Sequence, residues 1–428
     1  IAVLEAAAPG PDPLARARRL LARLDRTPPD RAGAPPFSGG LAGFLGYDLG
    51  GNFEPRMRVG PSTAAPAPDD APPPGDAPDE PALPPLRLGL YDWSIAWDRR
   101  TGAAYLGGRT FDGDQDRLGR RLAGVLDRLT VAPNALSRAG TAGCGSSEDL
   151  VFDTSLDRPS YEAGVRAIRA SIARGEIYQA NLARRLSTAF RGDPWSIYRI
   201  LRTGDPALFA GYIDLGQKRA IISASPEAFL SIDADRVVST DPIKGTRPRG
   251  DTPEDDRALA GELLGSAKDR AENVMIVDVL RNDLGRVCVP GSVRVPRLCR
   301  LERTSAVQHL VSTVTGRLAP GRDAFDLLAA AFPGGSITGA PKIRAIAVIE
   351  TLEPVRRGPY TGCALWLGPD GQLGSSILIR TFVADGRRLS LHVGGGITWR
   401  SDPAAEWAET VAKARGPLRA IGGREAVS

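Results

Sequence analysis

The sequence predicts an α+β fold in which mostly antiparallel β-sheets are covered by helices on the outside. Helical and strand-like hydrophobic patterns mix from Asp149 onward, and several helical segments run for 12 residues or more. Strand-like segments follow one another too closely for regular βαβ crossovers, which favours antiparallel pairing. The 428 residues contain no internal repeat and are enough for one large domain or two smaller ones.

The first 140 residues read as a small region of helix and strands that a polar loop interrupts. Residues 13–25 have the spacing of an amphipathic helix, and Phe37–Tyr47 reads as an apolar pair of strands punctuated by glycines. From about Gly60 to Pro85 the chain is rich in Pro, Ala and Asp and too poor in apolar groups to pack, so we predict a disordered surface loop. Beyond it the patterns predict strands at 86–97 and 103–107, a helix at 115–129 and a Gly- and Ser-rich linker at 138–148.

After this linker the chain predicts a larger region with long helices. Gly175 is a natural C-terminal stop for the helix that begins at Tyr161. The following segment alternates like a strand. The patterns predict helices at 161–174, 267–284, 340–351 and 404–420 and a strand at 177–186.

The composition is that of an ordinary globular protein, with 42% hydrophobic and 25% charged residues. The net charge is only +5 and the arginines are scattered, so nucleic-acid binding has no support. No window approaches 18 uninterrupted apolar residues, which argues against a membrane span. Nothing resembles a signal peptide, and we expect a cytoplasmic location. The four cysteines lack zinc or redox spacing, which fits a reducing compartment; they are Cys144, Cys288, Cys299 and Cys363.

Lys244 stands out because nearly every other cation of this chain is arginine. Among 55 Lys and Arg residues there are only five lysines. An ammonium group can lose its proton in a low-dielectric site and become an amine nucleophile, whereas a guanidinium stays charged. Pro242 and Gly245 flank the lysine with a stiff and a permissive residue, so we expect its side chain on a defined turn. The alternative is a solvated lysine at the end of a strand.

Two pairs of acidic residues recur at the helical i,i+3 spacing. Asp269 and Glu272 form one pair, and Glu406 and Glu409 form the other. Each pair presents two carboxylates on one helix face. Two such faces that meet would make a hard-oxygen site suited to Mg²⁺, which shares its coordination shell with anionic ligands. The alternative is that both pairs lie on solvated faces.

Two glycine-rich segments offer backbone N–H groups that could receive a carboxylate or phosphate. Gly394–Ile397 follows a predicted strand, and Phe332–Lys342 opens a predicted helix. The second segment is not a P-loop, because Gly339 is followed by Ala340 and Pro341 where Lys and Ser or Thr are required. Nucleotide binding is therefore not supported, and tight turns are the alternative for both segments.

Two further side chains are candidates for contact with a substrate. His309 suits either a buried, hydrogen-bonded core position or the polarisation of a substrate substituent. Arg380 ends the apolar segment Ser376–Arg380, a position that suits bidentate capture of a carboxylate or plain solvation. The other histidine, His392, receives no role.

Taken together, these segments resemble the chorismate-utilising enzymes. The resemblance covers about residues 150–425 and, more weakly, Phe37–Leu49. So many matches in one order are specific for the family. They imply a sandwich of two large, mostly antiparallel sheets with helices outside, an N-terminal region over residues 1–140 and a chorismate-binding catalytic domain over residues 149–426. The matching motifs are Gly175–Leu182, Ser225–Glu227, Pro242–Thr246, Asp269–Asn273, Arg281–Gly285, His309–Ser312, Pro333–Lys342, Ile379–Thr381, Gly394–Ile397 and the helix with Glu406, Glu409 and Lys413.

Within the family, the lysine motif resembles that of the aminodeoxychorismate-forming members, which read Pro-Ile-Lys-Gly-Thr where anthranilate synthases have Ala in place of the lysine. The resemblance implies that the amine of Lys244 attacks C2 of chorismate while Glu227, as a general acid, protonates the departing C4 hydroxyl. Ammonia then enters at C4 and expels the lysine, giving 4-amino-4-deoxychorismate for p-aminobenzoate and folate or related secondary metabolism. Gln179 stands where isochorismate- and salicylate-forming relatives carry a Lys that activates water.

The other matched positions imply a magnesium site and a substrate pocket. Glu272 and Glu409 match direct Mg²⁺ ligands, with Asp269 and Glu406 in the same acidic cluster, and the metal would neutralise a carboxylate of chorismate. The implied pocket consists of Tyr360 and Arg380, which hold a substrate carboxylate, and of Gln179, His309, Ser336, Lys413 and the N–H groups of Gly394, Gly395 and Gly396.

The resemblance also implies a partner that supplies ammonia. None of the cysteines lies in the Gly-x-Cys-x-Gly elbow of a glutaminase, and family members take ammonia from a glutamine amidotransferase. In the family this partner is either a separate subunit or a domain fused at the N-terminus, and the absence of an initial Met leaves open that this chain is cut from such a fusion.

One departure from the family and two alternative functions stay open. Asp241 precedes Pro242 where relatives often carry Arg or a neutral residue, and an acid beside Lys244 would favour the charged lysine unless it points away. One alternative is an anthranilate synthase component I, which would release pyruvate and a fluorescent aromatic product. The other is a non-catalytic chorismate-binding scaffold, which turnover dependent on Mg²⁺ and Glu227 would exclude.

Overall fold

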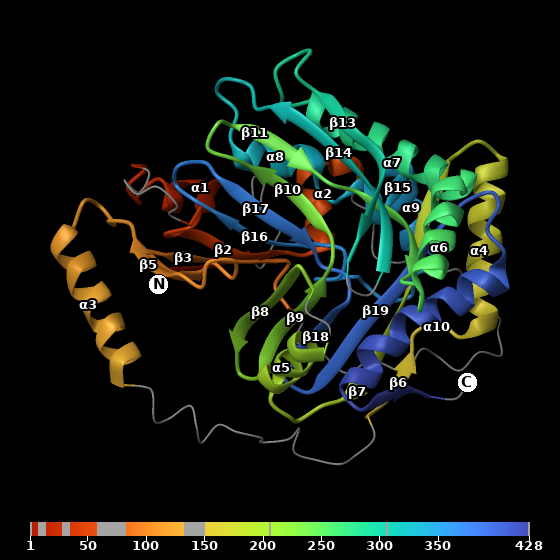
Figure 1. The fold of residues 1–428 in the computed structure, drawn as a ribbon, viewed down its shortest axis with the longest axis horizontal. Helices are drawn as coiled ribbons and strands as arrows, with labels where there is room; N and C mark the ends of the chain where they lie inside the picture. The colour runs from red at the N-terminus through yellow and green to blue at the C-terminus, as the bar shows by residue number, and fades with distance from the viewer. Residues whose placement is uncertain are drawn as a thin grey trace.

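The computed structural model describes residues 2–6, 14–27, 35–57, 83–131, 150–204, 207–304 and 307–426. It contains two large β-sheets with helices around them (Figure 1). The α+β class predicted from the sequence is confirmed. Most of the loop predicted from Gly60 to Pro85, and all of the linker predicted at 138–148, lie outside the described residues.

The larger sheet has ten strands and combines the N-terminal strands of residues 2–91 with strands of residues 228–377. Its order is β1-β3-β2-β16-β17-β10-β11-β14-β12, with β13 also paired to β14, and every pairing is antiparallel. Because β2 pairs with β16, strands of the predicted N-terminal region continue the sheet of the predicted catalytic domain. The division into two domains stays a prediction. The strands are β1 (Ala2–Ala6), β2 (Gly40–Leu45), β3 (Leu86–Tyr91), β10 (Ala228–Ile232), β11 (Val237–Thr240), β12 (Ile243–Pro248), β13 (Arg294–Arg303), β14 (Val307–Arg317), β16 (Cys363–Leu367) and β17 (Leu373–Ile377).

The smaller sheet has eight strands in the order β20-β6-β7-β19-β18-β9-β8, with β15 also paired to β7. Within the described residues only β20 and β6 pair in parallel. Phe44 of β2, Leu215 of β8 and Ile221 of β9 share one buried cluster, which joins the two sheets. The strands are β6 (Leu150–Thr154), β7 (Gln179–Ala189), β8 (Phe209–Gly216), β9 (Arg219–Ser225), β15 (Gly339–Ala340), β18 (Thr381–Asp385), β19 (Arg388–Ile397) and β20 (Gly423–Glu425); a separate hairpin consists of β4 (Trp93–Trp97) and β5 (Ala104–Gly108).

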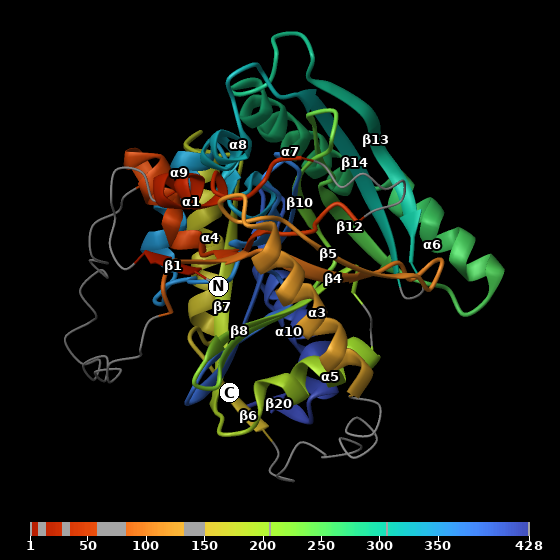
Figure 2. The same ribbon diagram turned by 90° about the vertical axis from the view of Figure 1, so that its left-hand side faces the viewer.

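The helices pack around the sheets, and two of them carry the acidic pairs. The helix α7 packs on β12 and β14 (Figure 2). The helix α10 packs on β19 and α4. Ser266 and Asp402 cap α7 and α10, each accepting a backbone N–H three residues further on. The helices are α1 (Ala15–Leu21), α2 (Gly50–Phe53), α3 (Gln115–Val131), α4 (Arg158–Ala173), α5 (Pro194–Gly204), α6 (Pro253–Gly265), α7 (Ala267–Gly285), α8 (Ala324–Ala331), α9 (Lys342–Leu352) and α10 (Pro403–Ala420), with 3₁₀ turns η1 (Tyr47–Leu49), η2 (Pro55–Met57) and η5 (Gly335–Ile337).

Two predictions for the N-terminal region were wrong in extent. The segment Phe37–Tyr47 contains one strand, β2, and not a pair, because the N–H of Gly46 binds the carbonyl of Pro85 and turns the chain into η1. The helix predicted over residues 13–25 ends at Leu21, since the N–H of Asp25 binds the carbonyl of Thr110.

The structure adds two observations on the chemistry of the chain. Cys288, Cys299 and Cys363 are buried free thiols, while Cys144 lies outside the described residues. Among the helices that the structure describes, none is both long and apolar enough to cross a bilayer.

Candidate active site

Lys244 extends from β12 to the loop between α8 and α9. Its Nζ atom donates a hydrogen bond to the backbone carbonyl of Ser336 in η5, 3.0 Å away. Burial lowers the pKa of Lys244, while the negative charges of Glu272 and Glu227 act in the opposite direction. The lysine is thus a half-buried amine between two acids, and not the solvated lysine of the alternative prediction.

A β-bulge sets the direction of the Lys244 side chain. Lys244 pairs with Leu310 and Thr246 pairs with His309, so Gly245 is an additional residue between them. Gly245 has φ +74°, and a Cβ atom there would lie 2.9 Å from Cβ of Asp269. The turn expected around Lys244 is therefore a bulge within a strand, and only glycine fits at its centre.

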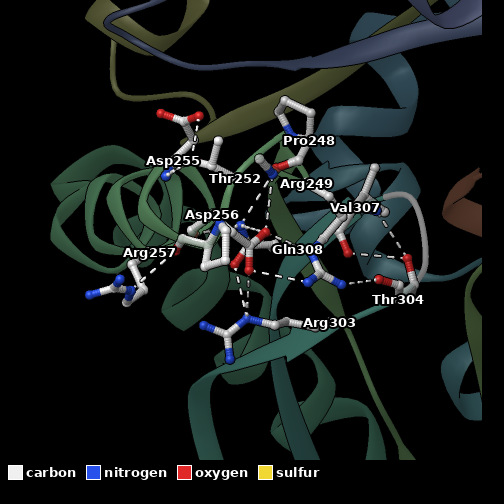
Figure 3. A network of polar contacts seen from close by, with 12 residues as sticks. Pro248, Arg249, Thr252, Asp255, Asp256, Arg257, Arg303, Thr304, Val307 and Gln308 are labelled. Atoms are coloured by element: carbon white, nitrogen blue, oxygen red, sulfur yellow. Dashed lines mark hydrogen bonds and ion pairs between the residues drawn. The ribbon is translucent and has the colours of Figure 1, made fainter.

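A polar network holds together β12, which contains the bulge, and β14, with which it pairs (Figure 3). The carboxylate of Asp256 in α6 accepts hydrogen bonds from Nε of Arg249 at 2.6 Å and from the N–H of Gly250 at 3.1 Å. It also accepts one from the fully buried amide of Gln308 at 3.2 Å. Since Gln308 precedes His309 on β14, the network joins the far end of β12 to the start of β14. On the bulge itself, the hydroxyl of Thr246 lies 3.0 Å from Nδ1 of His309.

Glu227 is a buried acid beside Lys244, with an exposed fraction of 6%. Burial raises the pKa of Glu227 to about 6, although the charge of Lys244, the hydroxyl of Ser336 and the N–H of Ile243 act in the opposite direction. Its Oε1 atom has no hydrogen-bond partner among the described residues. A carboxyl group with a pKa near neutrality can deliver a proton at physiological pH.

The two predicted acidic helix faces meet, with a lysine between them. Nζ of Lys268 lies 4.0 Å from Glu272 on α7 and 3.8 Å from Glu406 on α10. Burial raises the pKa values of both Glu272 and Glu406. Glu409, on the exposed side of α10, is paired with Nζ of Lys413 at 2.7 Å. Three of the four acids that were predicted to hold a metal are thus paired with lysine ammonium groups.

Asp269 lies at the edge of this acidic cluster. Its carboxylate accepts a hydrogen bond from Arg247 at 3.4 Å, and its Cβ packs against Gly245. Within the described ranges, no group of three or more His, Cys, Asp and Glu side chains is arranged to hold a metal ion. The Oε1 atom of Glu272 is nevertheless buried and has no hydrogen-bond partner in this part of the chain.

The three glycines 394–396 lie inside β19, paired with β7, and not after a strand as predicted. The reason is close approach of other groups, which a side chain would prevent. A Cβ on Gly395 would lie 3.1 Å from Oε2 of Glu406, and one on Gly396 would lie 2.3 Å from Nε2 of Gln179. The carbonyl of Gly394 accepts a hydrogen bond from Lys413 at 2.8 Å.

Gln179 begins β7 and is fully buried. Its Nε2 atom donates to Oδ1 of Asn181 at 3.3 Å, while its Oε1 atom has no partner among the described residues. An unpartnered amide oxygen in a buried position is costly unless a ligand or water binds it. Gln179 is therefore ready to accept a hydrogen bond beside the glycines of β19.

The predicted carboxylate-binding residues lie in two different settings. Tyr360 is buried and stacks on His392 with ring centroids 4.9 Å apart, and burial raises the pKa of Tyr360 to about 12. Burial also lowers the pKa of His392 to about 3, so this ring is neutral. Arg380 is exposed and lies just before β18. The pKa of His309 is lowered mainly by the burial of His309 itself and further by the positive charge of Arg380.

Asp241 is engaged by the neighbouring strand. Its Oδ1 atom accepts a hydrogen bond from the hydroxyl of Thr313 on β14 at 2.6 Å. The charges that act on Lys244 include those of Glu272, Glu227, Lys413 and Glu409. The charges around Lys244 thus come from the turn before β10, from α7 and from α10 rather than from the acid that precedes its own strand.

Two residues of this region were not recognised in the sequence. Lys268 had a usable signal, because it is one of five lysines and stands four residues before Glu272. Arg357 had none: it follows another arginine in a loop-like segment, although its side chain is buried in the structure.

Comparisons with known proteins show the family and the fold of the chain. The family described as chorismate binding enzyme matches residues 4–419. The chain is 41% identical to aminodeoxychorismate synthase component 1 of Klebsiella aerogenes, covering 94% of this chain and 81% of that protein. It is 40% identical to anthranilate synthase component 1 of Streptomyces coelicolor, covering 98% and 79%. The crystal structure of anthranilate synthase component I from Streptococcus pneumoniae is similar with a TM-score of 0.79 at 30% identity, covering 95% of this chain and 85% of that one.

Proposed function

The chain belongs to the chorismate binding enzyme family and is an enzyme of the aminodeoxychorismate or anthranilate synthase component I type, and from this premise we propose that it forms 4-amino-4-deoxychorismate from chorismate and ammonia. The observation that supports this choice is the half-buried amine of Lys244, 3.0 Å from the carbonyl of Ser336 and subject to the charge of Glu227. Anthranilate formation has no use for a nucleophile at this place.

The proposed reaction begins with attack of the neutral Lys244 amine on C2 of chorismate. The ring double bond shifts, the C4–O bond breaks, and Glu227 gives its proton to the departing hydroxyl, which leaves as water. The resulting carboxylate of Glu227 is then free to take up the proton that the lysine nitrogen releases. Ammonia forms a bond to C4, the double bond shifts back, and the C2–N bond breaks as Glu227 returns the proton to the lysine nitrogen. The new ammonium at C4 then gives one proton to the carboxylate of Glu227. The lysine amine is regenerated, and the net change is chorismate plus ammonia to aminodeoxychorismate plus water.

We also propose Mg²⁺ as the cofactor, with Glu272, Glu406 and Glu409 as the residues that would hold it and Asp269 at the edge of the cluster. The donor set fits a hard cation, because all four side chains are carboxylates. Two observations support a cation here: Oε1 of Glu272 is buried and accepts no hydrogen bond from the described residues, and the ammonium of Lys268 already lies between Glu272 and Glu406. When bound, Mg²⁺ would offset the charge of a substrate carboxylate.

The other polar groups of the site are proposed to bind the substrate. The exposed guanidinium of Arg380 and the hydroxyl of Tyr360 suit a carboxylate. His309, Ser336 and Gln179 offer hydrogen bonds to the rest of the molecule. Lys413 and the backbone of the β19 glycines complete the proposed pocket beside the acidic cluster.

Ammonia is proposed to come from a glutamine amidotransferase, as a separate subunit or a fused domain, in p-aminobenzoate and folate or related secondary metabolism. The relatives in both named groups are called component 1, which supports the need for a second component. We place the reaction in the cytoplasm, where buried free thiols such as Cys288 and Cys363 stay reduced. The chain alone should therefore use ammonium salts but not glutamine.

Anthranilate synthesis is the second candidate. The 40% identity to the Streptomyces coelicolor anthranilate synthase component 1, over 98% of this chain, favours it. The two activities differ in their products, since only the second releases pyruvate and a fluorescent aromatic acid.

The deciding experiment is turnover of chorismate with Mg²⁺ and a high concentration of ammonium, with products identified by mass. Aminodeoxychorismate from the wild type, and its loss or a change of product in Lys244→Ala, would support the proposal. Anthranilate and pyruvate from the wild type would show that the second candidate is correct. Chorismate binding without any turnover would favour the scaffold function.

A further inference from the structure

Arg357 is a buried arginine behind the candidate site, with an exposed fraction of only 3%. Its Nε and Nη2 atoms donate to the carboxylate of Glu353 at 2.8 and 2.7 Å. Glu353 follows α9 directly, and its Oε1 atom also accepts the N–H of Ala183 on β7 at 2.9 Å. The charges of Arg357 and Glu353 therefore neutralise each other, and Glu353 connects the end of α9 to β7.

The remaining donors of the guanidinium reach three other segments. Nη1 donates to the carbonyl of Ile337 at 3.0 Å and to the hydroxyl of Thr361 at 3.3 Å. Nη2 donates to the carbonyl of Asn181 at 3.1 Å. With the two bonds to Glu353, all five N–H groups of Arg357 have an acceptor. Such complete use of a planar fork is possible for arginine and not for lysine.

Each of these acceptors lies one or two residues from a side chain of the candidate site. Ile337 follows Ser336, whose carbonyl binds Lys244 and whose hydroxyl binds Glu227. Thr361 follows Tyr360, and Asn181 accepts the amide of Gln179. The guanidinium also lies 5.7 Å from the ring centroid of Tyr360 and 4.7 Å from that of Tyr47. One cation thus contacts the three backbone segments that carry Ser336, Tyr360 and Gln179.

We propose that Arg357 is a positioning residue that holds η5, the segment after Tyr360 and the start of β7 in one fixed arrangement, so that chorismate meets Ser336, Tyr360 and Gln179 together. This inference rests on the proposed function. A gain in stability does not by itself explain this ion pair, because a protein in which well-packed apolar residues replace a buried ion pair is often equally stable. Three bonds to backbone carbonyls and a hydroxyl of separate segments fix geometry instead.

The chain offers a matched control in Arg109. This arginine is also buried, with 4% exposed, and it lies 2.6 Å from Asp370 and donates to the hydroxyl of Ser38 at 2.9 Å. It likewise donates to a backbone carbonyl, that of Thr27. Within the described part of the chain, none of these partners belongs to a segment of the candidate site. Arg357→Lys and Arg109→Lys therefore remove the same fork from two similarly buried pairs.

The test compares both variants with the wild type in hydrogen–deuterium exchange, thermal unfolding and chorismate kinetics. We expect Arg357→Lys to speed exchange in peptides covering residues 179–183, 335–340 and 358–362, while Arg109→Lys leaves these peptides unchanged. At a temperature where both variants are folded, kcat/KM of Arg357→Lys should fall about a hundredfold, the effect expected when supporting groups shift by about 1 Å. Arg109→Lys should keep the turnover of the wild type.

Equal exchange in Arg357→Lys and the wild type, or equal losses of kcat/KM in the two lysine variants, would overturn the inference. If Arg357→Lys does not fold, Thr361→Val is the substitute, because it removes one of the five acceptors at nearly constant volume. Thr361→Val should fold and should have a reduced kcat/KM. Unchanged kinetics in this variant would again overturn the inference. A wild type that does not convert chorismate would refute the proposed function alone, because the exchange comparison needs no substrate.

Discussion

The Nζ atom of Lys244 donates a hydrogen bond to the carbonyl of Ser336, 3.0 Å away, and the hydroxyl of the same serine binds Glu227. A single residue of η5 therefore contacts both the proposed nucleophile and the proposed acid. Burial shifts the two groups towards their neutral forms, lowering the pKa of Lys244 and raising that of Glu227 to about 6. Neutral amine and protonated carboxyl are the states that the proposed reaction requires.

Replacing Lys244 by arginine should abolish the covalent step without removing the positive charge. A guanidinium cannot lose its proton at accessible pH, so it can pair with Glu227 and Glu272 but cannot attack C2. We expect Lys244→Arg to make no aminodeoxychorismate. The intact protein mass after incubation with chorismate, without ammonia, should show an adduct on the wild type only. Lys218→Arg, at an exposed lysine bonded to the carbonyl of Arg191, is the control. Normal turnover by Lys244→Arg would refute the nucleophile role.

The pH dependence of kcat/KM should be bell-shaped, because Glu227 and Lys244 must share one proton. Below the pKa of Glu227, about 6, both groups are protonated and the lysine cannot attack. Above the lowered pKa of Lys244 neither is protonated and no acid remains, so activity is highest between the two values. We expect an ascending limb with an apparent pKa near 6. Glu227→Gln should lose this limb and about 10²–10⁴-fold in rate. An ascending limb that persists in Glu227→Gln would assign it to another group.

The helices with local end signals were predictable from the sequence. The helix predicted at 267–284 is α7 (Ala267–Gly285), capped by Ser266, and the one predicted at 404–420 is α10 (Pro403–Ala420), capped by Asp402. The helix α6 was not predicted, although its sequence contains signals for the start of a helix: the cap Thr252, the following Pro253 and three acids in the first turn. The bulge at Gly245 could not be predicted, because it exists only in the register between β12 and the distant β14.

The candidate site was predictable in its residue types but not in its pairings. The bias against lysine singled out Lys244, and i,i+3 spacing singled out the acids of α7 and α10. The position of Lys268 between Glu272 and Glu406 depends on how these two helices pack. The same holds for Arg357, whose five acceptors come from segments far apart in the chain. Contacts of this kind follow from tertiary packing, which no local pattern encodes.

Magnesium binding should compete with Lys268. The ammonium of this lysine lies 4.0 and 3.8 Å from Glu272 and Glu406, where the proposed metal would bind. Lys268→Met should therefore bind Mg²⁺ more tightly than the wild type. A half-exposed ion pair contributes up to about 1 kcal/mol, so removing the competing ammonium should raise the Mg²⁺ affinity up to about fivefold. Calorimetric titration with MgCl₂ in the absence of chorismate measures this directly.

The controls for the metal prediction are Glu272→Gln, which should weaken Mg²⁺ binding, and Lys218→Met, which should leave it unchanged. Chelation by EDTA should stop turnover in the wild type, and added Mg²⁺ should restore it. Unchanged Mg²⁺ affinity in both Lys268→Met and Glu272→Gln would show that the metal, if used, binds elsewhere.

A methyl group on Gly396 should disturb the site without preventing folding. The added Cβ would lie 2.3 Å from Nε2 of Gln179, a fully buried side chain that cannot turn towards solvent. Overpacking of this kind costs about 1–3 kcal/mol, and relief requires the amide of Gln179 to move. Gly261→Ala is the control, because its Cβ meets nothing within 4 Å on exposed α6 and should add up to about 1 kcal/mol of stability. Thermal unfolding and chorismate turnover, measured together, should show a lower midpoint and impaired turnover for Gly396→Ala only. Full turnover in a destabilised Gly396→Ala would mean that the position of Gln179 does not matter for the reaction.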